Sequence, residues 1–376
     1  MFTVGVIGGG QLARMMHPAA TGLGITLKVF AESEGSSAHA GATMVGDYTE
    51  LDQLAEFAKS VDVVTFDHEH VPVALLARLE AKGVSVQPSS SALIHAQNKL
   101  VMRRRLTELG LPQPIWSEVK SAEELDEFVA KVGGEAIVKT PIGGYDGKGV
   151  RVVSSAADVQ DWLSDLPAYG GSLLAEQKVK FVRELAQLSA SNTAGEFRSW
   201  PVVQTVQAGG VCSEVLAPAP SPVDAAAAVD IARGVAQGLG VTGVLAVEMF
   251  ETESGELLVN ELAMRPHNSG HFSIEASTTS QFEQHLRAVL GLPLGDTELL
   301  AKAAVMINLL GVDGENDFVS HYPKAMQAFP EAKFHSYEKA PRAGRKMGHI
   351  TLLGNDYGLL RTRGQAAREL LYRGDA

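Results

Sequence analysis

The segment KTPIGGYDGKGV, residues 139–150, limits the folds open to this chain, because it contains four glycines where one strand-like run, EAIVK, gives way to another, GVRVV. Glycine loses more conformational freedom on folding than any other residue, so this density indicates a loop with special backbone demands. The loop does not fit the Walker type. Only three residues separate Gly143 from Gly147, Gly149 stands where that motif has serine or threonine, and a strand follows instead of a helix.

Two lysines suggest what this loop does. Backbone N–H groups in a glycine-rich loop can close over phosphates, and Lys148 would add a point charge to them. Lys139, the last residue of EAIVK, is expected to hold a phosphate from the rigid side of the same site. The alternative is a long hairpin turn with two solvated lysines.

A second feature is the run GVLAVEMFETESGELLVNELA, residues 243–263, which predicts two strands joined at the turn-forming pair Ser254-Gly255. If that pair is a two-residue turn, Glu248 and Glu261 face each other across the hairpin. Like charges directly opposite destabilise a sheet unless something neutralises them, and magnesium prefers carboxylate oxygens together with phosphate. The alternative is a pair of solvent-facing glutamates on an edge strand.

Hydrophobic periodicity outlines the fold as α/β and α+β. Strand-like and helix-like runs alternate from residue 2 to about 90, which predicts a parallel, Rossmann-like α/β domain. The middle of the chain is richer in antiparallel strand signals, and AAVMINLLG opens a small β-containing piece near residue 300. The expected domains are 1–95, 96–298 and 299–376.

Composition narrows the class of protein. The 376 residues are 45% hydrophobic and 20% charged, as in ordinary globular domains, and the net charge of −12 argues against a nucleic-acid or membrane surface. Cys212 is the only cysteine, so disulfides within the chain are excluded. The N-terminus lacks a secretory pattern, and no run of eighteen apolar residues follows. We therefore expect a cytoplasmic protein.

The N-terminal strand is followed by a possible dinucleotide fingerprint. Gly8, Gly10 and Ala13 fit G-x-G-x-x-A, and Glu32 ends the second strand, where a ribose-binding acid would lie. Taken alone, this pattern favours a nicotinamide-dependent dehydrogenase. It is weakly specific, because any tight strand-to-helix turn produces it, and the helix start could bind another anion.

Seven motifs follow one another along the chain: GGGQL, NK at 98–99, IVKTPIGGYDGKG, EQKV, AVEMF, NELAMRPHNSGH and PRAGRKMGH. Their order resembles the ATP-grasp carboxylase family of purine biosynthesis, the 5-(carboxyamino)imidazole ribonucleotide synthetases. The similarity spans nearly the whole chain, and GGYDGKG and RPHNSGH are its most specific parts.

This resemblance implies a three-domain ATP-grasp enzyme, an ADP-forming carbon-nitrogen ligase. It would use ATP, magnesium or manganese and bicarbonate, without NAD or biotin. The resemblance also implies that the acceptor is 5-aminoimidazole ribonucleotide and that the enzyme is a homodimer.

The resemblance implies phosphate-binding roles for Lys99, Lys139 and the loop 143–149. The backbone of EQKV would pair with adenine, and Glu184 would bind the ribose hydroxyls. Gln207 stands where relatives usually have histidine, and it cannot carry a charge. The implied ATP-binding residues are Lys99, Lys139, Gly143, Gly144, Tyr145, Asp146, Gly147, Lys148, Gly149, Glu176, Gln177, Lys178, Val179, Glu184, Gln207, Asn260 and Glu261.

The resemblance also implies an acceptor site that faces bicarbonate and the aminoimidazole. Lys339, Arg345 and Lys346 would clamp the ribose phosphate. The implied acceptor residues are Gln11, Leu12, Glu69, Tyr145, Asp146, Arg265, His267, Asn268, Lys339, Arg345 and Lys346, with Glu248 and Glu261 as metal ligands.

The chemistry expected from this set has two steps. Bicarbonate attacks the γ-phosphoryl group of ATP, with Lys139, Lys148 and Arg265 as the catalytic cations, and the resulting carboxyphosphate or the carbon dioxide that it releases reacts with the acceptor amine. Such an anhydride is lost to water, so the glycine loop would have to exclude solvent.

Several alternatives stay open at this point. Another ATP-grasp ligase, such as a formate-dependent glycinamide ribonucleotide transformylase, would share the nucleotide half of the site. A dehydrogenase or a non-catalytic nucleotide-binding regulator would belong to other classes. His267 with His271, or the histidines of DHEH at 67–70, could instead ligate a metal, although a loop or substrate contact is the simpler expectation.

Overall fold

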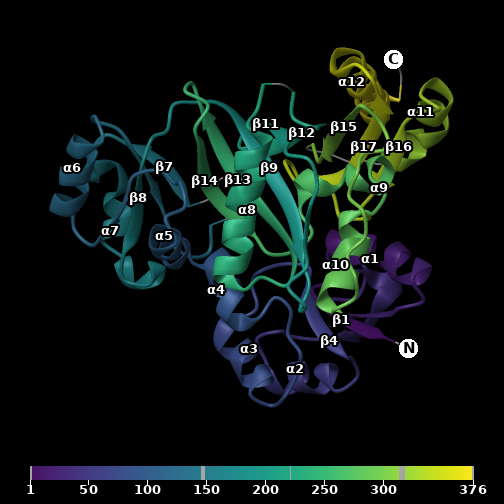
Figure 1. The fold of residues 1–376 in the computed structure, drawn as a ribbon, viewed down its shortest axis with the longest axis horizontal. Coiled ribbons are helices and arrows are strands. Elements are labelled where there is room, and N and C mark those ends of the chain that lie inside the picture. The colour runs from purple at the N-terminus through teal and green to yellow at the C-terminus, as the bar shows by residue number, and fades with distance from the viewer. Residues whose placement is uncertain (1, 145–148, 221, 313–317, 375–376) are drawn as a thin grey trace.

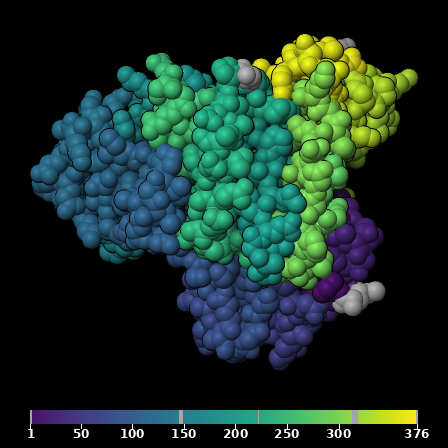
Figure 2. All heavy atoms as spheres, in the orientation of Figure 1, coloured from purple at the N-terminus to yellow at the C-terminus, as the bar shows by residue number. Residues whose placement is uncertain are grey.

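Three β-sheets organise the residues that the computed structural model describes, which are 2–144, 149–220, 222–312 and 318–374. Figure 1 shows the N-terminal lobe at the bottom, a second lobe at the left, and the largest sheet running through the middle towards the C-terminal helices. Figure 2 shows the same three-lobed outline with all atoms drawn.

The N-terminal lobe is a parallel four-stranded sheet in the order β3-β2-β1-β4, with helices between the strands. This confirms the expected parallel α/β start. Its elements are β1 (Thr3–Ile7), α1 (Gln11–Gly22), β2 (Thr26–Ala31), η1 (His39–Gly41), β3 (Ala42–Val45), α2 (Leu51–Ala58), β4 (Val63–Phe66), α3 (Val73–Glu80) and α4 (Ser90–Gln97).

The second lobe carries the glycine loop between two strands of a small antiparallel sheet, ordered β5-β8-β6-β7. Leu125, Phe128 and Trp162 pack under it and form its core. Its elements are α5 (Lys99–Glu108), β5 (Trp116–Val119), α6 (Ala122–Lys131), β6 (Ala136–Lys139), β7 (Val150–Val153), η2 (Ala156–Val159), α7 (Gln160–Leu163), η3 (Leu166–Tyr169) and β8 (Leu173–Gln177).

The largest sheet is antiparallel, in the order β14-β13-β9-β11-β12-β15-β17-β16, and β10 pairs with β9. Its first elements are β9 (Phe181–Ser191), β10 (Phe197–Ser199), β11 (Val203–Ala208), β12 (Val211–Ala217), α8 (Ala225–Leu239), β13 (Gly243–Thr252), β14 (Leu257–Ala263), η4 (Asn268–Gly270), α9 (Ser273–Ala276) and α10 (Gln281–Val289).

The C-terminal segment extends this sheet, because β15 pairs with β12 along four residues. The small piece expected after residue 300 therefore shares its sheet with the middle of the chain. Its elements are β15 (Ala303–Leu310), η5 (Phe318–His321), α11 (Tyr322–Ala328), β16 (Lys333–Ser336), β17 (Lys346–Gly354) and α12 (Tyr357–Arg373).

The apolar face of helix α8 packs between the largest sheet and the N-terminal lobe. Asp224 caps its first turn by accepting the N–H of Ala227, and its buried residues Ile231, Val235 and Leu239 recur every four positions. These side chains share one core with residues of β13 and of the N-terminal helices. Each fully buried aliphatic side chain of this kind stabilises the fold by about 1.5–3 kcal/mol.

A search of the described helices for one that combines the length and the low polarity needed to cross a bilayer finds no candidate.

Candidate active site

Two adjoining pockets, about 970 and 840 Å³ in volume, form one cleft between the lobes. The first is walled by the N-terminal lobe and the C-terminal segment, and the second by the glycine-loop lobe and the face of the largest sheet. Five residues line both pockets. They are Glu248, Glu261, His267, Asn268 and Lys346.

Glu248 and Glu261 are directly paired across strands β13 and β14, as the sequence predicts, but the turn that joins the strands differs from the prediction. The turn spans three residues, because Thr252 pairs with Glu256 and Gly255 takes a φ of +83°. A one-residue bulge at Asn260 offsets the change. The two-residue turn was wrong, and the facing pair results from two irregularities that cancel.

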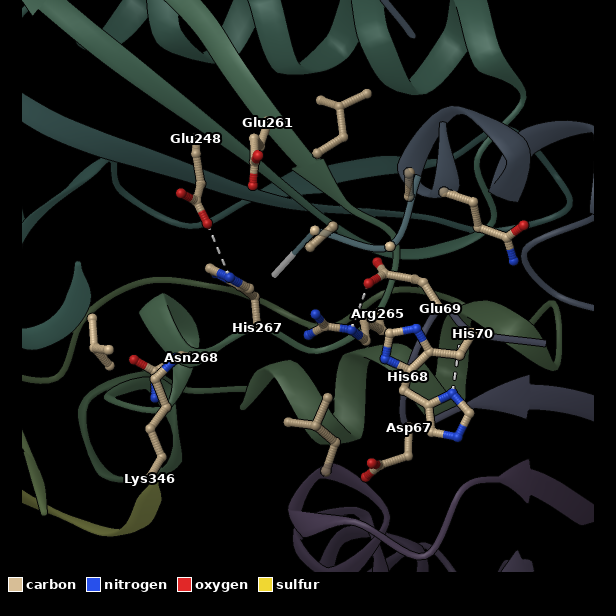
Figure 3. A pocket seen from close by; sticks show the side chains of 18 of the residues that line it. Asp67, His68, Glu69, His70, Glu248, Glu261, Arg265, His267, Asn268 and Lys346 are labelled. Carbon is tan, nitrogen blue, oxygen red and sulfur yellow. Dashed lines mark hydrogen bonds and ion pairs between the residues drawn. The ribbon is translucent and has the colours of Figure 1, made fainter. Parts of the chain in front are cut away.

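Each carboxylate of the pair has a basic neighbour from outside its hairpin. His267 Nε2 lies 3.1 Å from Glu248 Oε1 (Figure 3). Lys99 Nζ lies 3.5 Å from Glu261 Oε1. Burial alone would raise the pKa of Glu248, but the hydrogen bond and charge of His267, with the more distant Lys346 and Arg265, hold that pKa below its ordinary value. Glu248 therefore presents ionised oxygens to the cleft.

Lys99 reaches the pair because of a capped helix start. The side chain of Asn98 accepts hydrogen bonds from the N–H groups of Leu100 and Val101 at 3.0 and 3.1 Å, which begins α5 at Lys99. The NK dipeptide of the sequence thus supplies both the cap and the cation.

The second pocket contains the lysine at the end of β6. Lys139 is buried, and its Nζ lies 2.8 Å from Glu176 Oε2 and 3.0 Å from the side-chain oxygen of Asn260. Glu176, which was expected to act through its backbone, uses its side chain to hold this lysine. Burial would raise the pKa of Glu176, but the charges and hydrogen bonds of Lys139 and Arg103 lower it to about 2.

The rest of the second pocket is a half-apolar slot. The rings of Phe181 and Phe250 stack with centroids 4.7 Å apart at its edge. Burial and the negative charge of Glu248 raise the pKa of Glu184, while a hydrogen bond with Gln207 opposes that rise. Gln177, Lys178 and Val179 complete this wall.

The first pocket gathers the residues expected at the acceptor. Glu69 fixes Arg265, because one of its oxygens accepts the N–H of Met264 at 2.8 Å and the other accepts Arg265 Nε at 3.0 Å (Figure 3). Lys339 contacts the side chain of Gln11 across the pocket. The other expected acceptor residues that line this pocket are Leu12, His267, Asn268, Arg345 and Lys346.

In the glycine-rich turn after β1, one backbone donor is occupied by a carboxylate of the protein and another by a backbone carbonyl, since Gly8 N–H donates to Phe30. Gly9 N–H donates to Glu32 at 2.9 Å, and Glu32 also contacts His68 Nε2 at 2.9 Å. A hydrogen bond from His68 and that from Gly9 overcome the effect of burial and lower the pKa of Glu32 to about 2. The acid that would bind a ribose in a dinucleotide fold therefore holds the turn instead.

Asp67 explains one glycine of the same turn. Its Oδ1 accepts the N–H of Ala13 at 2.7 Å, and a Cβ on Gly10 would lie 1.9 Å from its Oδ2. Glycine is required at position 10 because this buried carboxylate caps the first turn of α1.

Part of the glycine loop lies outside the described residues, namely Tyr145, Asp146, Gly147 and Lys148. Gly143 and Gly144 line the first pocket, whereas Gly149 lines neither pocket. Gly149 instead closes the loop, since its carbonyl accepts the N–H of Thr140 at 2.9 Å and its φ is +72°.

The two histidines of RPHNSGH differ in how deeply they are buried. His267 lines the cleft, but His271 is fully buried and its Nδ1 lies 2.9 Å from Gln281 Nε2. Among the residues that the structure describes, no three histidine, cysteine or acidic side chains are grouped to hold a metal. Two carboxylates are still a sufficient protein contribution for magnesium, which takes phosphate oxygens and water as its other ligands.

Sequence reasoning missed Arg103, which is fully buried beside Glu176. It lies in the run MRRRLTE, where three successive arginines suggest only a solvated face, and no periodicity distinguishes the first of them. Asp67 and His68 were noted only as part of a possible metal motif, although they hold the glycine turn.

Three family models match successive parts of the chain. A ribonucleotide synthetase preATP-grasp domain matches residues 1–97, an ATP-grasp domain matches residues 104–282, and a phosphoribosylaminoimidazole carboxylase C-terminal domain matches residues 304–363. The expected fold class is thereby confirmed.

Relatives and solved structures agree with these models. The N5-carboxyaminoimidazole ribonucleotide synthase of Mycobacterium tuberculosis is 48% identical over 99% of this chain and 88% of its own length. A carboxyaminoimidazole ribonucleotide synthase of Aspergillus clavatus complexed with ATP has a TM-score of 0.88 at 33% identity, covering 99% of this chain and 98% of that one.

A second structure from the same organism is described as a complex with ADP and 5-aminoimidazole ribonucleotide. It has a TM-score of 0.87 at 33% identity and covers 99% of both chains. The extent of these matches, over both pockets and the strands between them, shows that this chain belongs to the N5-carboxyaminoimidazole ribonucleotide synthase family of ATP-grasp enzymes.

Proposed function

We propose that this protein uses ATP and bicarbonate to carboxylate the exocyclic amine of 5-aminoimidazole ribonucleotide, releasing ADP and phosphate. The observation that carries the proposal is the junction of two pockets at one pair of facing carboxylates, Glu248 and Glu261. A phosphoryl donor in one pocket and an acceptor in the other would have their reacting ends at the same place, which positions them for transfer.

We assign the second pocket to ATP. The stacked Phe181 and Phe250 offer an apolar edge suited to a purine ring, and Glu184 offers an oxygen to a ribose hydroxyl. Lys139 and Lys99 would meet the phosphates at the two ends of the carboxylate pair. The loop 143–149, with Lys148, would cover them from the other side.

We assign Glu248 and Glu261 to magnesium. They are hard oxygen ligands that lie directly opposite in the sheet, and a bound magnesium ion would reduce the repulsion between two acidic neighbours further than Lys99 and His267 do. A magnesium ion held there would supply charge neutralisation at the transferred phosphoryl group.

We assign the first pocket to bicarbonate and the ribonucleotide. Arg265, oriented by Glu69, would bind the bicarbonate anion near the pair. Lys339, Arg345 and Lys346 would bind the ribose phosphate, since they give a basic wall to a chain that is acidic overall. Gln11, Leu12, His267 and Asn268 would contact the rest of the acceptor.

The chemistry then has two bond exchanges. A bicarbonate oxygen bonds to the γ-phosphorus while the bond from that phosphorus to ADP breaks, and Lys139, Lys148 and Arg265 stabilise the spread negative charge. The acceptor nitrogen next bonds to the carboxyl carbon of carboxyphosphate, or of the carbon dioxide released from it. Phosphate leaves and the amine loses a proton.

We extend the proposal to the organisation of the protein. The domains would be 1–95, 96–298 and 299–376, the assembly a homodimer and the location the cytoplasm. Light scattering at micromolar concentration would test the assembly, and a mass of about one chain would contradict it.

The test of the activity is ATP turnover with bicarbonate, measured with and without 5-aminoimidazole ribonucleotide. ADP release that requires both, together with the carboxylated product, is expected. Turnover that requires formate and glycinamide ribonucleotide would support the transformylase, and tight NADH binding without ATP turnover would support the dehydrogenase. Nucleotide binding with no turnover would support a regulator.

A further inference from the structure

Arg103 is a charged side chain with no access to solvent. It lies on α5, one turn after Lys99, and its side chain is fully buried. Its guanidinium donates to Glu176 Oε1 at 2.5 Å, to the carbonyl of Val259 at 2.7 Å and to the carbonyl of Asn260 at 2.8 Å. A buried arginine is retained at such a place only when its charge and its donors are matched.

The two carbonyls belong to the bulge that sets the metal carboxylate. Met249 pairs with Val259 and Glu248 pairs with Glu261, so Asn260 is the additional residue between them. A one-residue shift in a strand moves every later side chain to the opposite face. By binding both carbonyls with one planar group, Arg103 fixes the bulge that directs Glu261 towards Glu248.

The third contact of Arg103 is with Glu176, which also binds Lys139, the lysine assigned to phosphate. Glu176 accepts Arg103 on one oxygen and Lys139 on the other, and Lys139 donates to the side chain of Asn260. The four residues therefore form a closed ring of contacts. Three of them, Arg103 of α5, Lys139 of β6 and Glu176 of β8, belong to the glycine-loop lobe, and Asn260 belongs to the largest sheet.

Charge counting within this ring gives Arg103 a second effect. One carboxylate, Glu176, is shared by two cations, so the ring has a net charge of +1 and Lys139 keeps attraction for an anion. Without Arg103, Glu176 would neutralise Lys139 alone. The loss of this net positive charge would strongly weaken the attraction for a phosphate, because solvent screens charges little in a buried site.

We propose that Arg103 is a positioning residue for phosphoryl transfer, which holds Lys139 and Glu261 in register and prevents Glu176 from neutralising Lys139. The inference rests on the assignment of the second pocket to ATP. A purely structural arginine would stabilise the fold without affecting nucleotide affinity in a charge-dependent way.

The test measures Mg-ADP and Mg-ATP binding by calorimetry, which needs neither bicarbonate nor acceptor. Arg103→Met should weaken nucleotide binding by roughly tenfold or more, because Glu176 would then neutralise Lys139 and the charge-assisted contact of Lys139 with the phosphate would be lost. The double variant Arg103→Met/Glu176→Gln restores the net charge of +1 and should regain several-fold of that affinity. Arg104→Met is the matched control, since Arg104 neighbours Arg103 but is half exposed and pairs with Glu118.

Arg103→Lys tests the geometric half of the proposal and keeps the test valid if Arg103→Met fails to fold. It retains the charge but not the planar fork, so nucleotide affinity should stay within about threefold while kcat falls by roughly tenfold and more magnesium is needed for half-saturation. Unchanged kcat and magnesium dependence would overturn the proposal.

The outcomes separate this inference from the assignment on which it rests. Wild-type protein that binds no nucleotide would refute the ATP site itself. Wild-type binding with equal affinity in Arg103→Met, or a double variant weaker than the single one, would refute only the role of Arg103.

Discussion

Glu248 and Glu261 lie opposite each other at the junction of the two pockets, and each has a different basic neighbour. His267 belongs to the loop after β14, whereas Lys99 begins α5 on the far side of the cleft. The pair is thus held between two separate parts of the chain. Its oxygens remain available to the cleft, since the side chains are 31% and 42% exposed.

The first prediction concerns this pair. Glu261→Gln keeps the size of the side chain but removes the charge, so kcat for ADP release should fall about a hundredfold or more. The melting temperature should stay close to the wild-type value, because the side chain is partly exposed. Glu256→Gln, at the exposed turn of the same hairpin, is the matched control and should leave kcat unchanged. Wild-type turnover of Glu261→Gln at saturating magnesium would refute the metal assignment.

The second prediction separates the two pockets. Arg345 lines only the first, so Arg345→Ala should raise KM for 5-aminoimidazole ribonucleotide by roughly tenfold or more and leave KM for ATP nearly unchanged. Arg363→Ala is the control, because Arg363 is an exposed arginine of α12 paired with Glu331. An equal rise in both constants would move this arginine to the nucleotide.

The third prediction concerns how Lys339 is placed. Arg14 of α1 binds Glu338 through two contacts of 2.9 and 2.6 Å, and Glu338 has a φ of +48°, which is unusual for a residue other than glycine. Arg14→Ala should therefore raise KM for the ribonucleotide and not for ATP. The effect should be at most about fivefold, since a partly exposed ion pair contributes about 0.2–1 kcal/mol. No change in either constant would show that Lys339 is placed without this pair.

The sequence predicted the local elements of the site better than its irregularities. Strand periodicity and a turn-forming pair predicted that Glu248 faces Glu261, and this pairing is right only because a longer turn and a bulge cancel. They could not reveal the three-residue turn or the bulge at Asn260, because a bulge depends on what its free carbonyls contact, and here that partner is Arg103, more than 150 residues away.

Contacts across lobes were hidden for the same reason. The fixed orientation of Arg265 comes from Glu69, and the closed turn after β1 comes from Asp67 and Glu32. A single sequence shows these as isolated charges, since their meaning depends on the pairing order of strands. The family resemblance supplied the pockets as sets of residues, but not the hydrogen bonds that orient them.

The last prediction uses a histidine that joins three elements. His285 of α10 is fully buried, its Nδ1 accepts the N–H of Val244 at 3.0 Å, and its Nε2 lies 2.7 Å from the hydroxyl of Thr65. Because Nδ1 accepts, Nε2 carries the proton and donates to Thr65, so the ring is neutral. Burial lowers its pKa from 6.5 to about 3.

This shift makes folding stability depend on pH in a defined direction. Between pH 6.5 and 3 the unfolded chain binds a proton at His285 that the folded chain excludes, so stability is full above pH 6.5 and falls as the pH is lowered. Between pH 7.5 and 5.5 the wild-type free energy of unfolding should fall by roughly 1 kcal/mol more than that of His285→Gln. Urea unfolding of both proteins at the two pH values measures this difference. His271 and His349 are buried in both proteins and cancel, so an equal fall in both would show that folding does not lower the pKa of His285.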